Sequence, residues 1–166
     1  ISPYFTMRNL EPSTQQQIQE RTLTLATQAG ESFNLLLEPL EIRFDLSGSV
    51  WGTYQRKHGA CLIRYNPWLF AHYPEDGIRD TVPHEVAHYI VDMRYQRYCR
   101  PHGPEWRGIM QFFGIAEPKA TAQHDLAGIP VRRQRRHVYR CDCRTHDLST
   151  TRHNRVQRGH QYACRR

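Results

Sequence analysis

The chain has 166 residues, of which 39% are hydrophobic and 11% aromatic, and it carries a formal net charge of +7. This composition excludes an intrinsically disordered chain and predicts one domain with a core and room for a small appendage. No apolar run approaches the roughly 20 residues that span a bilayer, and no signal-peptide pattern opens the chain, which predicts a cytoplasmic protein without a membrane partner. The sequence begins at Ile1 rather than Met and stops shortly after a cysteine, so we expect both ends to be incomplete.

A helix and three strands are predicted in the first part of the chain. Residues 13–29 open with a capping-box pattern and place their apolar residues near one helical face, namely Ile18, Leu25, Ala26 and Ala29. Leu40–Leu46 alternates apolar and charged residues with the period of a half-buried strand. Two shorter, glycine-flanked strands are predicted at Val50–Tyr54 and Ala60–Tyr65. The short connections predict a small antiparallel sheet and, with the helices, an α+β fold.

Three helices are predicted after the sheet. A short helix follows Asn66-Pro67 and runs through Phe70, where the missing N–H of proline costs nothing. A longer helix is predicted over Ile78–Tyr95, with a core-facing stripe made of Val82, Val86, Tyr89, Ile90 and Met93. After a proline-bounded break, Pro104–Phe113 is predicted to form another helix.

The sequence His84-Glu85-Val86-Ala87-His88 is an H-E-x-x-H motif within the longer predicted helix. Residues four apart lie one turn apart on the same face, so two imidazoles can bind one Zn²⁺ at about 2.0 to 2.1 Å. Glu85 lies one step round the helix, where it can take a proton from zinc-bound water. Chance placement gives roughly 0.03 such motifs in a chain with this His and Glu content, which disfavours the alternative of an exposed helix with polar His side chains.

A catalytic zinc site needs a third protein ligand and an open position. The segment that follows, Pro-His-Gly-Pro-Glu-Trp at 101–106, offers two candidates. Glu105 suits the first turn of a helix through the helix dipole, whereas His102 has no such structural role, so we favour His102. Trp106 is expected to belong to the core beneath this segment. Asp92 either orients a ligand imidazole or is a helix-surface acid, and no oxyanion donor is identified.

The charge is concentrated after residue 120, which predicts a domain over 1–120 and a basic region over 121–166. Residues 1–120 carry 12 Lys and Arg against 13 Asp and Glu, whereas 121–166 carry 11 Arg against 3 Asp. Arginine suits phosphate and interleaved aromatic residues suit base stacking, which predicts salt-sensitive, weakly sequence-specific binding of unpaired or distorted nucleic-acid strands. A solvated, solubilising surface is the alternative. The arginines assigned to this interface are Arg132, Arg133, Arg135, Arg136, Arg140, Arg152, Arg155 and Arg158.

Three of the five cysteines lie in the basic region, and an odd number so placed does not suit a secreted disulfide scaffold. Tyr139–Cys143 and Tyr162–Cys164 are predicted as two short strands that bring sulfur ligands to one point, as in a zinc ribbon. The candidate ligands of a second, structural Zn²⁺ are Cys141, Cys143, Cys164 and, as the fourth, His146 or else His153. Reduced cysteines without a metal are the alternative.

The sequences H-E-V-A-H at 84–88, P-H-G-P-E-W at 101–106 and R-H-N-R-V at 152–156, within a Cys-rich basic tail, resemble the SprT-like zinc metalloprotease family, its bacterial members in particular. The resemblance spans about residues 40–164 and includes Arg-Tyr-Asn-Pro at 64–67. It implies a zincin-like metallopeptidase core, three His ligands, which favours His102, and a zinc-ribbon-like tail. Eukaryotic relatives cut proteins crosslinked to DNA, an activity that is expected here from the resemblance alone.

The preferred hypothesis is a monomeric zinc metalloendopeptidase whose substrates are DNA-associated or DNA-crosslinked proteins. Tethering by the tail would provide selectivity by raising the effective concentration of such substrates. The alternative is a non-catalytic, zinc-containing nucleic-acid-binding protein, and a weaker third hypothesis is a metal-dependent hydrolase of a non-peptide substrate. Replacing Glu85 by Gln separates the first two, since only the first needs a water-activating carboxylate.

Overall fold

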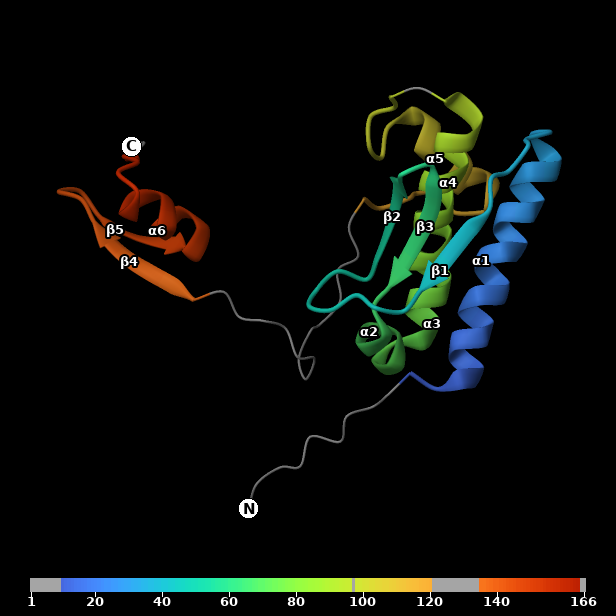
Figure 1. Ribbon diagram of the computed structural model, residues 1–166, viewed down its shortest axis with the longest axis horizontal. Helices are drawn as coiled ribbons and strands as arrows, with labels where there is room; N and C mark the ends of the chain where they lie inside the picture. Colours follow the sequence, from blue (N-terminus) through green and yellow to red (C-terminus); the bar gives the residue numbers. More distant parts are fainter. Residues whose placement is uncertain (1–9, 97, 121–134, 165–166) are drawn as a thin grey trace, which may run out of the picture. The chain divides into compact units, whose positions relative to one another are not determined.

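The computed structural model describes residues 10–96, 98–120 and 135–164, whose path is drawn in Figure 1. The chain divides into two compact units, Ile1–Val131 and Arg132–Arg166, which are described separately below. The boundary expected near residue 120 adjoins residues 121–134, which lie outside the described part, so its position stays a prediction. None of the helices in the described ranges is long and apolar enough to cross a membrane.

The first unit combines helices with a small sheet, which confirms the predicted α+β class. Its strands and the helix that precedes them are α1 (Pro12–Ser32), β1 (Leu40–Arg43), β2 (Gly52–Lys57) and β3 (Ala60–Tyr65). The elements that follow are α2 (Pro67–His72), α3 (Pro74–Asp76), a π-helical turn η1 (Gly77–Thr81), α4 (Val82–Tyr95) and α5 (Pro104–Phe112). The predicted elements therefore form, although the helix expected from Ile78 begins as the π-helical turn.

The sheet has the strand order β1-β3-β2, with β2 antiparallel and β1 parallel to β3. The β2–β3 hairpin turns at His58 and Gly59, whose φ angles of 51° and 81° are those that a tight two-residue hairpin loop requires. The predicted antiparallel sheet is thus confirmed for β2 and β3 and wrong for β1 and β3. Short connections do reverse the direction of consecutive strands, but β3 inserts between β1 and β2 and therefore runs parallel to β1.

Helix α4 is the central element of the first unit, and Figure 1 shows it behind the sheet. It packs on β2, β3, α1 and α5. The predicted core-facing stripe is confirmed, because all five of its residues are buried: Val82, Val86, Tyr89, Ile90 and Met93. His84 and His88 are only partly buried. The apolar stripe therefore fixes the rotation of α4 and leaves both imidazoles accessible.

Asn66 is a fully buried polar residue that connects the end of the sheet to α2. Its side-chain oxygen accepts hydrogen bonds from the backbone N–H groups of Trp68 and Leu69, at 3.1 and 3.4 Å. Its amide nitrogen donates to the backbone carbonyls of Gly48 and Val50, both at 3.0 Å. One side chain thus caps α2, as the Asn-Pro pair predicted, and holds the chain that enters β2.

The second unit contains an antiparallel hairpin and one helix, namely β4 (Arg136–Arg140), β5 (Thr145–Ser149) and α6 (Thr150–Gln157). The strand predicted at Tyr139–Cys143 overlaps β4 only at its start, because Cys141–Cys143 lie in the hairpin loop. The strand predicted at Tyr162–Cys164 is wrong, since those residues have no regular structure. Helix α6 was not predicted, although the Ser149 side chain accepts a hydrogen bond from the backbone N–H of Arg152 as an N-cap does.

Candidate metal centre

Three histidine side chains come together between α4 and the turn that precedes α5. His84 and His88 lie one turn apart on α4, and His102 lies in the turn at residues 101–103. The φ angle of His102 is 55°, a left-handed conformation that residues other than glycine seldom adopt. Such a conformation costs energy and persists only where the surrounding structure holds it, which is common at functional sites.

The Nε2 atoms of the three rings face one another. The separations are 3.3 Å between His84 and His88, 3.2 Å between His88 and His102, and 3.0 Å between His84 and His102. Two nitrogens bound at about 2.0 to 2.1 Å to a tetrahedral zinc ion lie roughly 3.3 Å apart. The three nitrogens thus have the separations of ligands around one small cation, so the donor set and its dimensions fit Zn²⁺.

The three imidazoles are held in the neutral form that metal binding requires. Burial, with a smaller contribution from neighbouring imidazole charge, lowers the pKa of His84 to about 3 and that of His88 to about 4. The pKa of His102 is also lowered, by burial first and by the charge of Arg107 second. At neutral pH each of the three imidazoles is therefore uncharged and has one ring nitrogen with a lone pair to offer a metal.

Trp106 lies against all three imidazoles and is only 1% exposed. This is the position expected for a core residue beneath the segment 101–106. Its ring centroid is 4.8 Å from that of His84, 5.8 Å from His88 and 4.7 Å from His102. Its indole N–H donates to the backbone carbonyl of His84 at 3.3 Å.

The His84 ring also hydrogen-bonds the backbone of Lys119. Such a bond from the second ring nitrogen is usual in metal-binding histidines because it fixes the ring orientation.

Glu85 lies on the side of α4 that faces β2 and is only 6% exposed. Burial raises the pKa of its carboxyl to about 8, and a hydrogen bond with the backbone of Tyr54 acts in the opposite direction. A carboxyl that exchanges its proton near neutral pH suits general acid–base catalysis. A dication bound nearby would lower this pKa again and favour the carboxylate.

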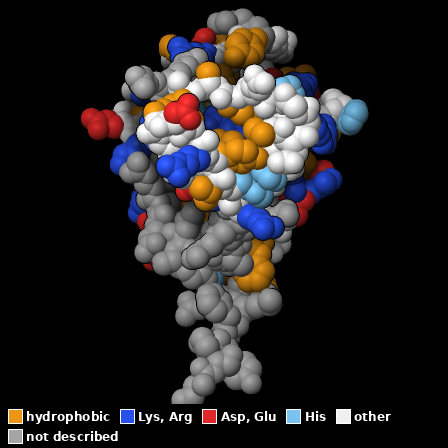
Figure 2. Space-filling view, turned by 90° about the vertical axis from the view of Figure 1, so that its left-hand side faces the viewer, with side chains coloured by type: hydrophobic (Ala, Val, Ile, Leu, Met, Phe, Trp, Pro, Cys, Tyr) orange, Lys and Arg blue, Asp and Glu red, His pale blue; other side chains and the backbone are white. Residues whose placement is uncertain are grey.

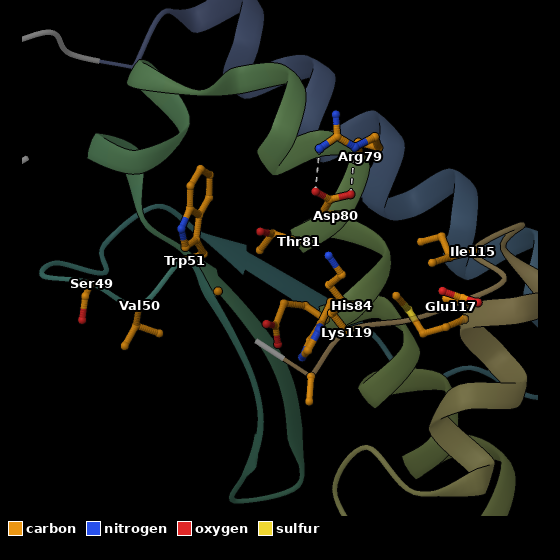
Figure 3. Close-up of a pocket in the computed structure, with 14 residues that line it drawn as sticks. Ser49, Val50, Trp51, Arg79, Asp80, Thr81, His84, Ile115, Glu117 and Lys119 are labelled. Atoms are coloured by element: carbon orange, nitrogen blue, oxygen red, sulfur yellow. Dashed lines mark hydrogen bonds and ion pairs between the residues drawn. The ribbon is translucent and has the colours of Figure 1, made fainter. Parts of the chain in front are cut away.

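A cavity of about 640 Å³ adjoins His84 and Glu85, and Figure 3 shows the side chains around it. The chain entering β2 forms one side, the segment after α5 forms another, and Thr81 of η1 also lines it. At its edge Arg79 pairs with Asp80 at 2.7 Å. The cavity provides access to the histidine cluster for a molecule larger than water.

The structure separates the alternatives for the third ligand and for Asp92. Glu105 does not belong to the histidine group, so His102, the favoured candidate, is the one that joins His84 and His88. The Asp92 carboxylate accepts hydrogen bonds from the Tyr54 hydroxyl at 2.6 Å and from Arg56 at 3.1 Å. It therefore connects α4 to β2 rather than orienting a ligand imidazole.

A second group of metal-binding side chains surrounds the β4–β5 loop. The Cys141 sulfur lies 3.0 Å from that of Cys143 and 3.2 Å from His146 Nε2, and the Cys143 sulfur lies 3.3 Å from that of Cys164. All of these cysteines are free thiols. Hydrogen bonding from Cys143 and His146 lowers the pKa of the Cys141 thiol, which favours the thiolate that binds metals. The structure thus groups the three cysteines of the preferred set, and His146 lies beside Cys141 without belonging to that group.

The alternative fourth ligand, His153, has other contacts. Its Nδ1 lies 2.8 Å from the Tyr139 hydroxyl. Its ring stacks on that of His137, with centroids 3.7 Å apart and an interplanar angle of 7°. His153 therefore packs α6 against β4, and His146 is the histidine beside the thiols.

Six of the eight arginines assigned to nucleic acid lie in the described part of the tail, and all six are exposed: Arg135, Arg136, Arg140, Arg152, Arg155 and Arg158. Arg132 and Arg133 lie outside it. Arg152 is placed over the ring of Tyr162, 5.9 Å from its centroid. On the face drawn in Figure 2, Lys and Arg side chains are spread among hydrophobic and His side chains. The described tail arginines therefore have the exposure that phosphate contacts need.

Two residues of the site were not predicted from the sequence. Lys119 hydrogen-bonds the His84 ring through its backbone, and Gly52 lies against Glu85. Lys119 follows its hydrogen-bond partner His84 by 35 residues, and no local sequence pattern reveals a contact over that distance. Gly52 did carry a signal. An isolated glycine inside a strand pattern indicates a close approach by another part of the protein.

Comparison with known proteins gives consistent matches over most of the chain. The sequence profile of the SprT-like family matches residues 18–128. Protein SprT of Pseudomonas savastanoi pv. phaseolicola is 36% identical over 152 residues, which cover 90% of this chain and 90% of that protein. Protein SprT of Pasteurella multocida is 30% identical over 163 residues, which cover 95% of this chain and 95% of that protein. Protein SprT of Vibrio parahaemolyticus is 42% identical over 106 residues, which cover 63% of this chain and 61% of that protein. No solved structure matches the chain.

Proposed function

The chain belongs to the SprT-like family, and on that basis we propose that it is a zinc-dependent metalloendopeptidase with a zincin-like core. His84, His88 and His102 bind the metal, and Glu85 is the acid–base residue. The observation that carries the proposal is the approach of three neutral imidazole nitrogens to within 3.0 to 3.3 Å of one another beside a buried carboxyl.

The chemistry follows from the positions of these groups. When bound, Zn²⁺ lowers the pKa of a coordinated water to about 7 and polarises a scissile carbonyl. Glu85, in the carboxylate form that a nearby dication favours, accepts the proton of the attacking water and delivers it to the leaving amine. The Lys119 backbone and Trp106 hold the imidazoles in place during this exchange. The cavity beside Glu85 admits the peptide segment next to the scissile bond.

A second, structural Zn²⁺ is part of the proposal, held by Cys141, Cys143, Cys164 and His146 in a zinc-ribbon-like tail. Three thiols and one imidazole are a usual donor set for structural zinc. The compact group of the three thiols supports it, as does the 3.2 Å approach of His146 Nε2 to the Cys141 sulfur. The site closes the hairpin loop onto the segment that follows α6.

The tail is proposed to bind single-stranded or distorted DNA and thereby to direct cleavage to DNA-associated or DNA-crosslinked proteins. Support comes from the six exposed arginines, which form no ion pair with a carboxylate within residues 135–164. The cation–aromatic contact of Arg152 with Tyr162 offers a surface on which a base can stack. A monomeric, cytoplasmic enzyme remains the predicted state.

A protein-degradation assay tests the proposed function. Zinc-loaded protein is incubated with a DNA-binding protein substrate alone, with single-stranded DNA and with double-stranded DNA, beside the Glu85→Gln variant. We expect cleavage by the wild type, and a loss of about 10²-fold or more in the variant with zinc still bound. Equal cleavage by both forms would refute the role of Glu85. No cleavage by either, with DNA binding intact, would support the non-catalytic alternative.

A further inference from the structure

The carboxyl of Glu85 lies against a strand position that has no side chain. A Cβ atom added at Gly52 would lie 2.7 Å from Glu85 Cγ and 3.0 Å from its Oε1. The same atom would lie 2.9 Å from the Thr81 methyl group. Figure 3 shows Thr81 and His84 between the segment that carries Trp51 and the segment that carries Lys119. Glu85 therefore occupies the space that any other residue at position 52 would fill.

The requirement for glycine at position 52 is steric. Gly52 is absent from the glycines with positive φ, so its backbone is open to any L-residue. Only the contacts with Glu85 and Thr81 exclude a side chain. Separations under about 3 Å are well inside ordinary carbon–carbon contact distances, so one of the groups has to move.

The surroundings restrict which group can move. Gly52 pairs with Tyr65 of β3, whose side chain is fully buried, so the strand is anchored. Thr81 is also buried, within the turn that continues into α4. The Glu85 side chain faces the cavity, which gives its carboxyl room to swing away from β2. A side chain at position 52 is thus accommodated by displacing that carboxyl.

We propose that Gly52 is a positioning residue for Glu85: by lacking a side chain it fixes the carboxyl against β2, at the place from which it serves the reacting water. This inference rests on the proposed peptidase function. A displacement of about 1 Å in a catalytic group lowers the rate by about 10²-fold. The gap at Gly52 is therefore expected to act on turnover, through the position of the Glu85 carboxyl.

The test compares Gly52→Ala with two glycine variants elsewhere in the first unit. A Cβ at Gly30 would lie 2.8 Å from Leu37, a clash of similar size that touches no residue of the site. A Cβ at Gly108 would meet nothing within 4 Å. For each zinc-loaded protein, the zinc content, the thermal unfolding midpoint, and kcat and KM on one protein substrate are measured.

We expect Gly52→Ala to retain its zinc and to keep KM within about twofold, while kcat falls by about 10- to 100-fold. Gly30→Ala should unfold at a lower temperature with kcat unchanged, and Gly108→Ala should resemble the wild type. The inference is overturned if Gly52→Ala keeps its kcat, if its loss follows loss of zinc, or if Gly30→Ala loses as much.

A crystal structure of zinc-loaded Gly52→Ala separates failure of this inference from failure of the proposed function. If the wild type itself cleaves nothing, the peptidase proposal fails. The position of the Glu85 carboxyl in the variant still decides the inference, because a displaced carboxyl supports it and an unmoved one overturns it.

Discussion

The histidine cluster of the first unit and the cysteine cluster of the tail are both groups of metal-binding side chains, but their surroundings differ. His84 and His88 project from a helix whose apolar stripe is buried, and Trp106 lies fully buried against them. Among residues 135–164 none is buried, and α6 packs on the hairpin through partly buried side chains such as the stacked His137 and His153. A unit this small and without a core gains little from hydrophobic burial. The first site is therefore held by packing, whereas the tail has little packing, and on the proposed function it depends on a metal bound by its cysteines.

Loss of the tail metal is expected to have the largest effect. The apparent free energy of structural zinc binding is about 10 to 16 kcal/mol, more than a coreless unit can supply by packing. Cys143→Ser should therefore abolish amide-exchange protection throughout β4, β5 and α6 and leave α4 protected. His84→Ala, the matched change in the first site, should leave both units folded. Unchanged tail protection in Cys143→Ser would show that the tail folds without its metal.

Trp106→Ala is expected to have the next largest effect, because it removes the packing that distinguishes the first site. Deleting a buried tryptophan side chain costs about 3 to 5 kcal/mol of unfolding free energy. Zinc affinity should fall as well, since all three imidazoles lose their common contact. Trp106→Phe keeps part of the packing but loses the hydrogen bond to the His84 carbonyl. Its unfolding free energy and its zinc affinity should therefore lie between those of the wild type and of Trp106→Ala. Urea denaturation and competitive zinc titration measure the effects; a Trp106→Ala protein with normal zinc affinity would contradict the account.

Acid should destabilise the metal-free first unit. The lowered pKa values of His84, His88 and His102 mean that the unfolded chain binds more protons than the folded one as pH falls from about 6.5 toward 4. His84 and His88 each cost up to about 1.4 kcal/mol per pH unit in that window, and the less buried His102 adds a smaller amount in the same direction. Because the pKa of Glu85 is raised, the folded chain binds more protons at this carboxyl than the unfolded chain does between about pH 4.5 and 8. This single group therefore opposes the effect of the imidazoles but does not outweigh it.

Urea denaturation of the metal-free protein, monitored by Trp fluorescence at several pH values, measures this dependence. The slope should be positive between pH 4.5 and 6.5 and should flatten in a His84→Gln, His88→Gln double variant. A wild-type slope no steeper than that of the double variant would show that the imidazoles are not held in the neutral form.

Removal of two tail arginines is expected to have the smallest effect. If Arg152 and Arg155 contact phosphate, their joint replacement by Ala should reduce the slope of log K against log salt by about 1.4 to 1.8 for DNA binding. Arg43→Ala, which removes an exposed cation of the first unit paired with Glu41, should leave that slope unchanged. Equal slopes in all three proteins would place the DNA contact elsewhere.

The contrast between the units also explains how far the sequence could predict the structure. The α4 stripe, the paired His84 and His88, and His102 just beyond the helix are separated by few residues, so helical periodicity and motif spacing suffice to identify them. The parallel pairing of β1 with β3 was missed because strand order is set by contacts far apart in sequence. The place of Gly52 against Glu85 needs the same long-range information.

In the tail, prediction succeeded for the side chains that gather and failed for the elements that carry them. Cys141, Cys143 and Cys164 do form one group, as residue types that bind one kind of ion predicted, whereas His146 lies beside Cys141 and its role as fourth ligand stays a prediction. The strand expected at Tyr162–Cys164 was wrong and α6 was missed. A unit without a core has no apolar periodicity to read, so the usual signal for helices and strands is weak there.

X-ray absorption at the zinc edge of a Cys141→Ser, Cys143→Ser variant, which retains only the first site, tests the central claim most directly. The account predicts one bound zinc with three imidazole nitrogens at about 2.0 to 2.1 Å and one oxygen from water. It predicts further that His102→Ala removes one of these nitrogens from the spectrum. A protein that binds no zinc at this site, or a spectrum unchanged by His102→Ala, would contradict it.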